Sequence, residues 1–178
     1  QLGFKSQLGG RVAGGIIIPY GNSEVAPFAE SFYVGGANSI RAFTVRSVGP
    51  GRYRSDDAEY AYFDRVGDIK LEANLEYRFN IFGGLYGALF LDAGNVWNLK
   101  NFFEYEGAED GVFRLKDFWR EMALGTGFGV RYDLDFFVLR LDLGIGLHLP
   151  YDTGKSGFYK IPKFRDGLGF HFAIGYPF

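Results

Sequence analysis

A strict alternation of apolar and polar residues most constrains this chain, because a period of two fixes the two faces of a β-strand. The last nine positions, 170–178, place aromatic or aliphatic side chains on one such face. That face comprises Phe170, Phe172, Ile174, Tyr176 and Phe178. The pattern predicts a terminal strand that is apolar on one side up to the end of the sequence.

The same alternation recurs upstream, where the opposite face is charged or made of glycine. Residues 71–81 carry the clearest example, with Glu72, Asn74, Glu76, Arg78 and Asn80 on the polar face. Further strands are predicted over 85–97, 124–134 and 137–149, and a less regular one over 6–20. A soluble sandwich could bury one apolar face, but apolar side chains outside and polar ones inside are typical of a barrel in lipid.

Composition supports this interpretation and excludes other classes. The sequence has no run of about 18 apolar residues, which excludes a transmembrane helix. Aromatic residues at 19% and 27 glycines fit interfacial girdles and close strand packing. The net charge of -2 gives no reason to expect nucleic acid, and the absence of cysteine excludes disulfides.

Connection lengths add an independent argument. Long segments over 21–67, 98–120 and 150–168 alternate with short turns near 80–84 and 133–135. Outer-membrane barrels have short periplasmic turns, so the C-terminus is expected on the periplasmic side. Six strands fall below the minimum of about eight for a closed barrel, so either strands precede this chain or it closes with another copy. No signal peptide is visible, and we expect a mature fragment of something longer.

The first long loop contains the tip Ile40-Arg41-Ala42-Phe43, preceded by Gly-Gly-Ala-Asn-Ser and followed by Gly-Pro-Gly. It resembles the sixth extracellular loop of the BamA/TamA family of outer-membrane β-barrel assembly proteins, the bacterial surface antigen family. In that family the loop folds back into the lumen, and its tip reads Val-Arg-Gly-Phe or a close variant. Ala42 replaces the glycine, and alanine disfavours the positive φ that glycine allows.

Downstream motifs resemble the same family in the expected order. Segments near 67–79, 90–97, 127–132 and 139–142 are similar to its twelfth to fifteenth strands, and the terminal strand is similar to its C-terminal β-signal. The resemblance covers residues 1–178 and implies an all-β fold, the last six strands of a sixteen-stranded transmembrane antiparallel β-barrel. Residues 21–67 would be the long lumen-inserting loop. The wording of this loop is most similar to the TamA-like lipoprotein branch of Bacteroidetes.

Arg41 is expected to form a lock inside the barrel. A guanidinium on a lumenal loop needs carboxylate partners, and the inward rows supply Glu76 and Asp92 on adjacent strands. Family members pair the tip arginine with acidic residues at matching positions. The alternative is that Arg41 lies on a solvated external loop while the carboxylates line a wet channel.

The terminal strand forms one wall of the barrel, and the resemblance implies two further roles. It would be the signal by which the barrel is itself assembled, and it would form a weak seam with the first strand. An open seam exposes backbone groups that can pair with an incoming strand. The implied seam residues are Phe170, Phe172, Ile174, Gly175, Tyr176 and Phe178.

The resemblance implies insertion or assembly of β-barrel proteins into the bacterial outer membrane, or translocation across it, through an openable seam. The implied partners are outer-membrane lipids, unfolded outer-membrane protein clients, and periplasmic domains or accessory lipoproteins outside this chain. No cofactor is expected. A two-partner-type secretion pore of the same superfamily is one alternative. A passive porin-like channel is another, and it explains the alternation but not the tip motif.

Catalysis and metal binding have little support in the sequence. His148 or His171 could act on Ser39 or Ser156, but no motif places a nucleophile beside a base, so no enzyme is expected. The acidic pairs Asp56-Asp57 and Asp133/Asp135 are more typical of solvated turns than of a cation site, and no metal is expected.

Overall fold

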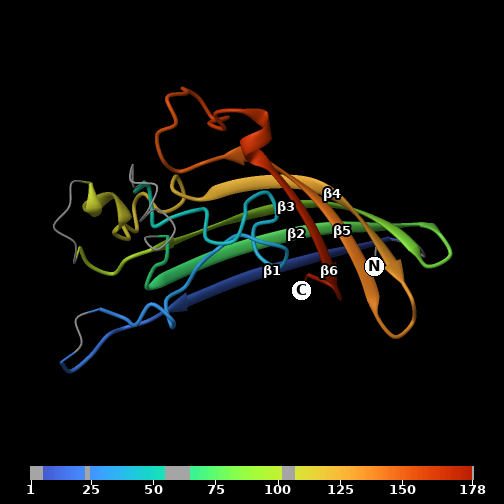
Figure 1. Ribbon diagram of the computed structural model, residues 1–178, viewed down its shortest axis with the longest axis horizontal. Helices are drawn as coiled ribbons and strands as arrows, with labels where there is room; N and C mark the ends of the chain where they lie inside the picture. Colours follow the sequence, from blue (N-terminus) through green and yellow to red (C-terminus); the bar gives the residue numbers. More distant parts are fainter. Residues whose placement is uncertain (1–5, 23–24, 55–64, 102–106, 178) are drawn as a thin grey trace.

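The computed structural model describes residues 6–22, 25–54, 65–101 and 107–177, which form a single antiparallel sheet (Figure 1). Six strands follow one another in chain order, and each is hydrogen-bonded to the next. The described residues contain two short 3-10 helices and no α-helix, and neither helix is long and apolar enough to cross a membrane. The prediction of an all-β antiparallel fold is confirmed. The elements are β1 Ser6–Ile16, β2 Ile69–Phe82, β3 Leu85–Trp97, η1 Ala108–Gly111, β4 Ala123–Asp133, β5 Val138–His148, η2 Phe164–Gly167 and β6 Leu168–Ile174.

Burial along the strands follows the predicted period of two. On β2 the inward Glu72 and Glu76 are buried, whereas Leu75 between them is exposed. The antiparallel register carries the pattern across the sheet, so that Leu75 lies opposite the exposed Leu91 of β3. Exposed outward side chains include Val12, Leu89, Phe128, Leu141, Phe170 and Phe172. The sheet therefore has an apolar outer face and a charged inner face.

Short turns join the strands at one end of the sheet, and long segments join them at the other. In Figure 1 the two short turns, at 83–84 and 134–137, lie on the right, away from the long loops. The long connections cover 17–68, 98–122 and 149–167. This order of long and short connections is the predicted one. The sheet is open, since β1 and β6 each have a single neighbouring strand among the described residues.

Both outermost strands are shorter than the sequence predicts. β1 ends at Ile16 rather than near Tyr20. β6 ends at Ile174 because Gly175 adopts a φ of +90°, a left-handed conformation that interrupts extended backbone. The prediction of a strand that continues through residues 175–177 is wrong, and Phe178 lies outside the described residues.

Trp97 and Leu149 end the apolar rows of the strands predicted over 85–97 and 137–149, which were expected to face outward, but both are buried. Trp97 at the end of β3 is fully buried, because its Nε1 donates to Glu121 at 2.6 Å and its ring meets Phe113 edge-on. Leu149 follows the end of β5 and packs in the apolar cluster beneath the first long loop. A period of two gives the face of a residue, but it does not show whether a loop covers that face. Loops cover both residues here, which explains the two differences.

The first long connection folds back over the inner face of the sheet, as the light-blue to cyan segment in Figure 1 shows. Its buried residues Val34, Ile40, Phe43 and Val48 cluster with Val96 of β3. The backbone N–H of Gly51 also donates to the Val96 carbonyl at 2.7 Å. Residues 32–51 are therefore packed against the wall formed by the strands.

Candidate functional site

The loop tip, residues 39–43, is a closed turn. The Phe43 N–H donates to the Ile40 carbonyl at 3.1 Å, and the Gly36 N–H donates to the Phe43 carbonyl at 2.8 Å. Gly35 has a φ of +100°, and a Cβ there would lie 2.1 Å from the Thr44 carbonyl oxygen. Ala42 is not among the described residues with positive φ, so alanine fits the tip without backbone strain.

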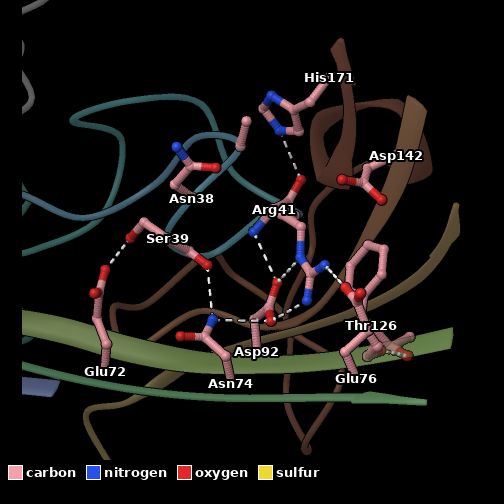
Figure 2. A network of polar contacts seen from close by, with 12 residues as sticks. Asn38, Ser39, Arg41, Glu72, Asn74, Glu76, Asp92, Thr126, Asp142 and His171 are labelled. Atoms are coloured by element: carbon pink, nitrogen blue, oxygen red, sulfur yellow. Dashed lines mark hydrogen bonds and ion pairs between the residues drawn. The ribbon is translucent and has the colours of Figure 1, made fainter. Parts of the chain in front are cut away.

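Arg41 lies buried between two carboxylates, as Figure 2 shows. Its Nε and Nη2 each donate to one Asp92 oxygen at 2.8 Å, and its backbone N–H donates to Asp92 Oδ2 at 3.0 Å. Its Nη1 donates to Glu76 Oε2, and its Cζ lies 3.7 Å from the centre of the Phe90 ring. Arg41 is 1% exposed and both carboxylates are 0% exposed. The structure thus brings the three predicted residues together, and Arg41 is not on a solvated external loop.

The carboxylates stabilise the charged form of the buried guanidinium. Burial by itself lowers the pKa of Arg41, because a low-dielectric environment disfavours the charged form. Hydrogen bonds and the negative charges of Asp92 and Glu76 outweigh burial, and the net effect raises the pKa of Arg41. Removing one carboxylate would therefore leave a buried cation with an incomplete set of partners.

Glu76 is shared with arginines of the wall itself. Arg131 Nη2 lies 2.9 Å and Arg78 Nε 2.5 Å from its oxygens. Arg131 Nη1 also lies 2.6 Å from Asp142, and Arg140 Nε lies 3.1 Å from the same carboxylate. These side chains belong to the predicted inward rows, but the sequence pattern does not assign them to the site. A period of two gives the face of a residue and not its height along the wall.

The residues just before the tip bind the same inner face. Ser39 Oγ donates to Glu72, and Asn74 Nδ2 donates to the Ser39 carbonyl at 2.8 Å (Figure 2). Two strands far apart in the sheet order bind Asn38. Arg11 of β1 donates to its carbonyl at 3.1 Å, and Arg140 of β5 donates to its Oδ1 at 2.6 Å. Side chains of β1, β2 and β5 therefore bind the loop in addition to the predicted pair.

The wall beneath the tip backbone is made of glycine. A Cβ at Gly144 of β5 or Gly169 of β6 would lie 2.3 Å from the Arg41 carbonyl oxygen. A Cβ at Gly125 of β4 would lie 2.3 Å from the Ala42 Cβ. No larger residue fits at these positions unless the tip moves.

A second attachment holds the loop after the tip. Asn95 Nδ2 of β3 donates to the Gly51 carbonyl at 2.9 Å and to the Glu121 carbonyl at 2.5 Å. Arg52 Nε lies 3.5 Å from the Glu121 carboxylate, which is 2% exposed. Glu121 was missed by sequence reasoning, because it lies in a long connection without a periodic pattern.

The predicted seam residues lie on β6 and just beyond it. Phe170, Phe172 and Ile174 are exposed on the outer face. Gly175 ends the strand, and the prediction that Tyr176 shares the face of Phe170 is wrong, because the centre of its ring lies 4.4 Å from Cζ of Arg78, an inward side chain of β2.

Among the described residues, both histidines hydrogen-bond to backbone carbonyls and not to a serine. His148 Nδ1 lies 2.8 Å from the Phe158 carbonyl, and His171 Nε2 lies 2.8 Å from the Arg41 carbonyl. Asp133 Oδ1 accepts from the Asp135 N–H at 3.0 Å, as in a turn, and residues 56–57 lie outside the described residues. Within the described ranges, no three histidine, aspartate or glutamate side chains gather where they could hold a metal ion.

An antiparallel sheet that is apolar outside and charged inside, with a loop bound to its inner face, is a section of membrane β-barrel wall with an occupied lumen. The chain belongs to the Omp85 superfamily, whose domain model matches residues 2–178. This confirms the predicted relation to the BamA/TamA-type family, and it places the chain in an outer membrane. The Bacteroidetes branch stays a prediction.

Three relatives illustrate the range of the similarity. The chain is 36% identical over 160 residues to the sorting and assembly machinery component 50 homolog of Homo sapiens, which covers 86% of this chain and 31% of that protein. It is 32% identical over 113 residues to the outer membrane protein assembly factor BamA of Neisseria meningitidis, and the match covers 61% of this chain and 14% of that protein. It is 28% identical over 172 residues to BamA of Nitratidesulfovibrio vulgaris, and the match covers 95% of this chain and 19% of that protein. The chain therefore spans less than a third of each of these relatives.

Proposed function

We propose that this chain is the terminal part of a barrel that inserts β-barrel proteins into the bacterial outer membrane. The observation that carries the proposal is the buried ion pairing of Arg41 with Asp92 and Glu76. Relatives of this chain are called a sorting and assembly machinery component and an outer membrane protein assembly factor, which supports the same activity here. The proposed clients are unfolded outer-membrane proteins.

The lock supports assembly over passive conduction. A porin-like channel requires an open lumen, whereas residues 32–51 cover the inner face of this wall. Removing one partner of a buried ion pair costs about 3–5 kcal/mol, because the other charge is left buried without compensation, so loss of Asp92 or Glu76 should destabilise the docked tip. We propose that the lock keeps the loop in the lumen while the barrel engages a client.

We propose that β6 is one side of an openable seam. It has seven residues, against eleven to fourteen in β1 to β5, and its outer edge has no partner among the described residues. The other side would be the first strand of the whole barrel, outside this chain. Unpaired N–H and C=O groups at an open edge can template a client strand. Burial of that strand in lipid, with its backbone bonds satisfied, would supply the driving force.

The proposed mechanism involves no bond-making chemistry. Outer-membrane lipids would contact the exposed apolar row, and a short terminal strand would disorder the bilayer locally through hydrophobic mismatch. Periplasmic domains or accessory lipoproteins outside this chain would deliver clients.

A charge-swap experiment in the whole protein tests the proposal. Arg41→Glu, and Arg41→Glu combined with Asp92→Arg, are expressed in cells depleted of the wild type, and outer-membrane protein levels are measured. Lys116→Glu, at an exposed position in the second long connection, is the matched charge-reversal control. The single change at Arg41 should abolish assembly, the double change should restore part of it, and the control should have no effect.

Two other outcomes would favour other functions. If both Arg41 variants assemble outer-membrane proteins like the wild type while their own barrels stay folded, the lock has no role in assembly and a plain channel becomes the better account. If outer-membrane protein levels stay normal while export of a substrate fails, a secretion pore of the same superfamily is favoured.

A further inference from the structure

His171 of β6 makes a polar contact with the loop tip. The inward positions of β6 are Gly169, His171 and Ala173, so His171 is the one inward side chain of this strand that can hydrogen-bond. Its Nε2 lies 2.8 Å from the Arg41 carbonyl oxygen, and Figure 2 shows this contact on the side of Arg41 opposite its guanidinium. The ring N–H donates and the carbonyl accepts.

The glycines around this contact explain how the carbonyl reaches β6. A Cβ at Gly144 or Gly169 would lie 2.3 Å from the Arg41 carbonyl oxygen, so the tip backbone lies directly on these two positions. No backbone N–H of the described residues donates to this carbonyl. Because a buried carbonyl without a partner is costly, His171 satisfies an acceptor that the tip itself leaves open.

Arg41 thus contacts both parts of the proposed machinery. Its side chain binds Glu76 and Asp92 on β2 and β3, and its carbonyl binds β6. Residue 41 belongs to a closed turn, so a shift of the side chain also displaces the carbonyl. The lock and the terminal strand are therefore connected through a single residue.

We propose that His171 is a positioning residue that couples docking of the loop tip to the pairing of β6 with β5. The inference rests on the proposed function, because it gives the lock control over the seam strand. When the tip is docked, His171 holds β6 in register. When the tip leaves, β6 loses this contact and frays more readily. The coupling is reciprocal, so loss of His171 also loosens the tip.

Backbone amide hydrogen exchange of the whole protein in lipid nanodiscs tests this coupling. His171→Ala should speed exchange in both 39–43 and 168–174 by about 5- to 150-fold, the range expected when a buried acceptor loses its donor. His171→Gln keeps an N–H donor and should restore part of the protection in both segments. Partial rescue separates the hydrogen bond from a general packing defect.

His148→Ala is the matched control, because His148 also bonds a loop carbonyl, that of Phe158. It should speed exchange in 149–160 and leave the tip unchanged. In the reverse direction, Arg41→Ala should speed exchange in β6, although the Arg41 side chain does not bond to that strand.

The proposal is overturned if His171→Ala affects β6 without the tip, or if Arg41→Ala frees the tip while β6 stays as protected as in the wild type. Either result leaves the proposed function intact as long as the Arg41→Glu charge swap still controls assembly. If the charge swap fails while the exchange coupling holds, the proposed function is wrong and the coupling stands as a property of the wall.

Discussion

The two halves of the wall hold the same loop tip by different means. β2 and β3 face it with the carboxylates of Glu76 and Asp92, whereas β4 to β6 face it with Gly125, Gly144 and Gly169. The carboxylate half supplies the ionic attraction to Arg41, and the glycine half supplies room for the tip backbone together with the hydrogen bond from His171. Charge alone therefore does not position the loop, because the guanidinium meets Asp92 while the tip backbone lies flat against glycine.

One reporter can measure how firmly each half holds the tip. The sequence has no cysteine, and Val34 is fully buried in the loop's apolar cluster. In the whole protein, with any other cysteine replaced, Val34→Cys should react with a membrane-impermeant maleimide only when the loop leaves the wall. The rate of labelling then reports the opening equilibrium, and each 1.4 kcal/mol corresponds to about a tenfold change.

The largest effect is expected in the carboxylate half. Asp92→Ala removes the bidentate partner of Arg41 and leaves a buried guanidinium with an incomplete set of partners. The cost of breaking a buried pair in this way is about 3–5 kcal/mol, so labelling should accelerate by more than about a hundredfold. A rate within about threefold of the parent would show that the carboxylate half does not retain the loop.

The next largest effect is expected in the glycine half. Gly144→Ala would place a Cβ 2.3 Å from the Arg41 carbonyl oxygen and 2.6 Å from the Ala42 nitrogen, while every charged partner stays in place. Overpacking costs about 1–3 kcal/mol, so labelling should rise by about 5- to 150-fold. Gly10→Ala on β1 is the matched control, because its Cβ would meet nothing closer than 3.8 Å. Equal labelling rates in Gly144→Ala and Gly10→Ala would contradict the claim that the tip needs glycine at position 144.

A smaller and reversible effect is expected where Ala42 meets Gly125. A Cβ at Gly125 would lie 2.3 Å from the Ala42 methyl group, so Gly125→Ala should loosen the tip and Ala42→Gly should relieve the clash. Coupling between contacting residues is about 0.5–3 kcal/mol. The double variant should therefore label more slowly than Gly125→Ala alone. Independent effects of the two changes would show that this contact does not position the tip.

The smallest effect is expected at an exposed ion pair of the loops. Arg52 and Asp110 lie 2.9 Å apart, with side chains 47% and 43% exposed. Exposed pairs contribute about 0.2–1 kcal/mol, so Asp110→Ala should change labelling by less than about fivefold. This variant also controls for the Asp→Ala change at Asp92. A large effect here would mean that the loops, and not the lock, hold the tip in place.

The sequence predicted the charged partners because strand periodicity fixes faces. Glu76 and Asp92 could be assigned to the inner face from their neighbours alone, and Arg41 from its motif. The predicted inner faces also include Arg131, Arg140 and Asp142. Their place in the network depends on the register between β4 and β5, which pairs Arg131 with Arg140 and Gly129 with Asp142. Periodicity in one strand does not contain that information.

Other parts of the site could not be predicted because they depend on loop paths. Glu121 lies in a connection without periodicity, and Trp97 is buried because a loop covers its face of β3. His171 could be assigned to the inner face, but its contact with the Arg41 carbonyl depends on how deeply the loop enters. β6 ends early because Gly175 adopts a positive φ. Glycine adopts positive and negative φ almost equally well, so the sequence does not show which one occurs here.

The central claim is that the Arg41–Asp92 pair holds the loop on the wall, and a double-mutant cycle on the Val34→Cys reporter tests it most directly. Arg41→Ala, Asp92→Ala and the double variant are labelled under identical conditions. If the pair holds the loop, each single change accelerates labelling strongly, and the double variant labels no faster than the faster single variant, because both changes break the same interaction. Multiplication of the two single effects, or a parent loop that is already labelled as fast as the variants, would contradict it.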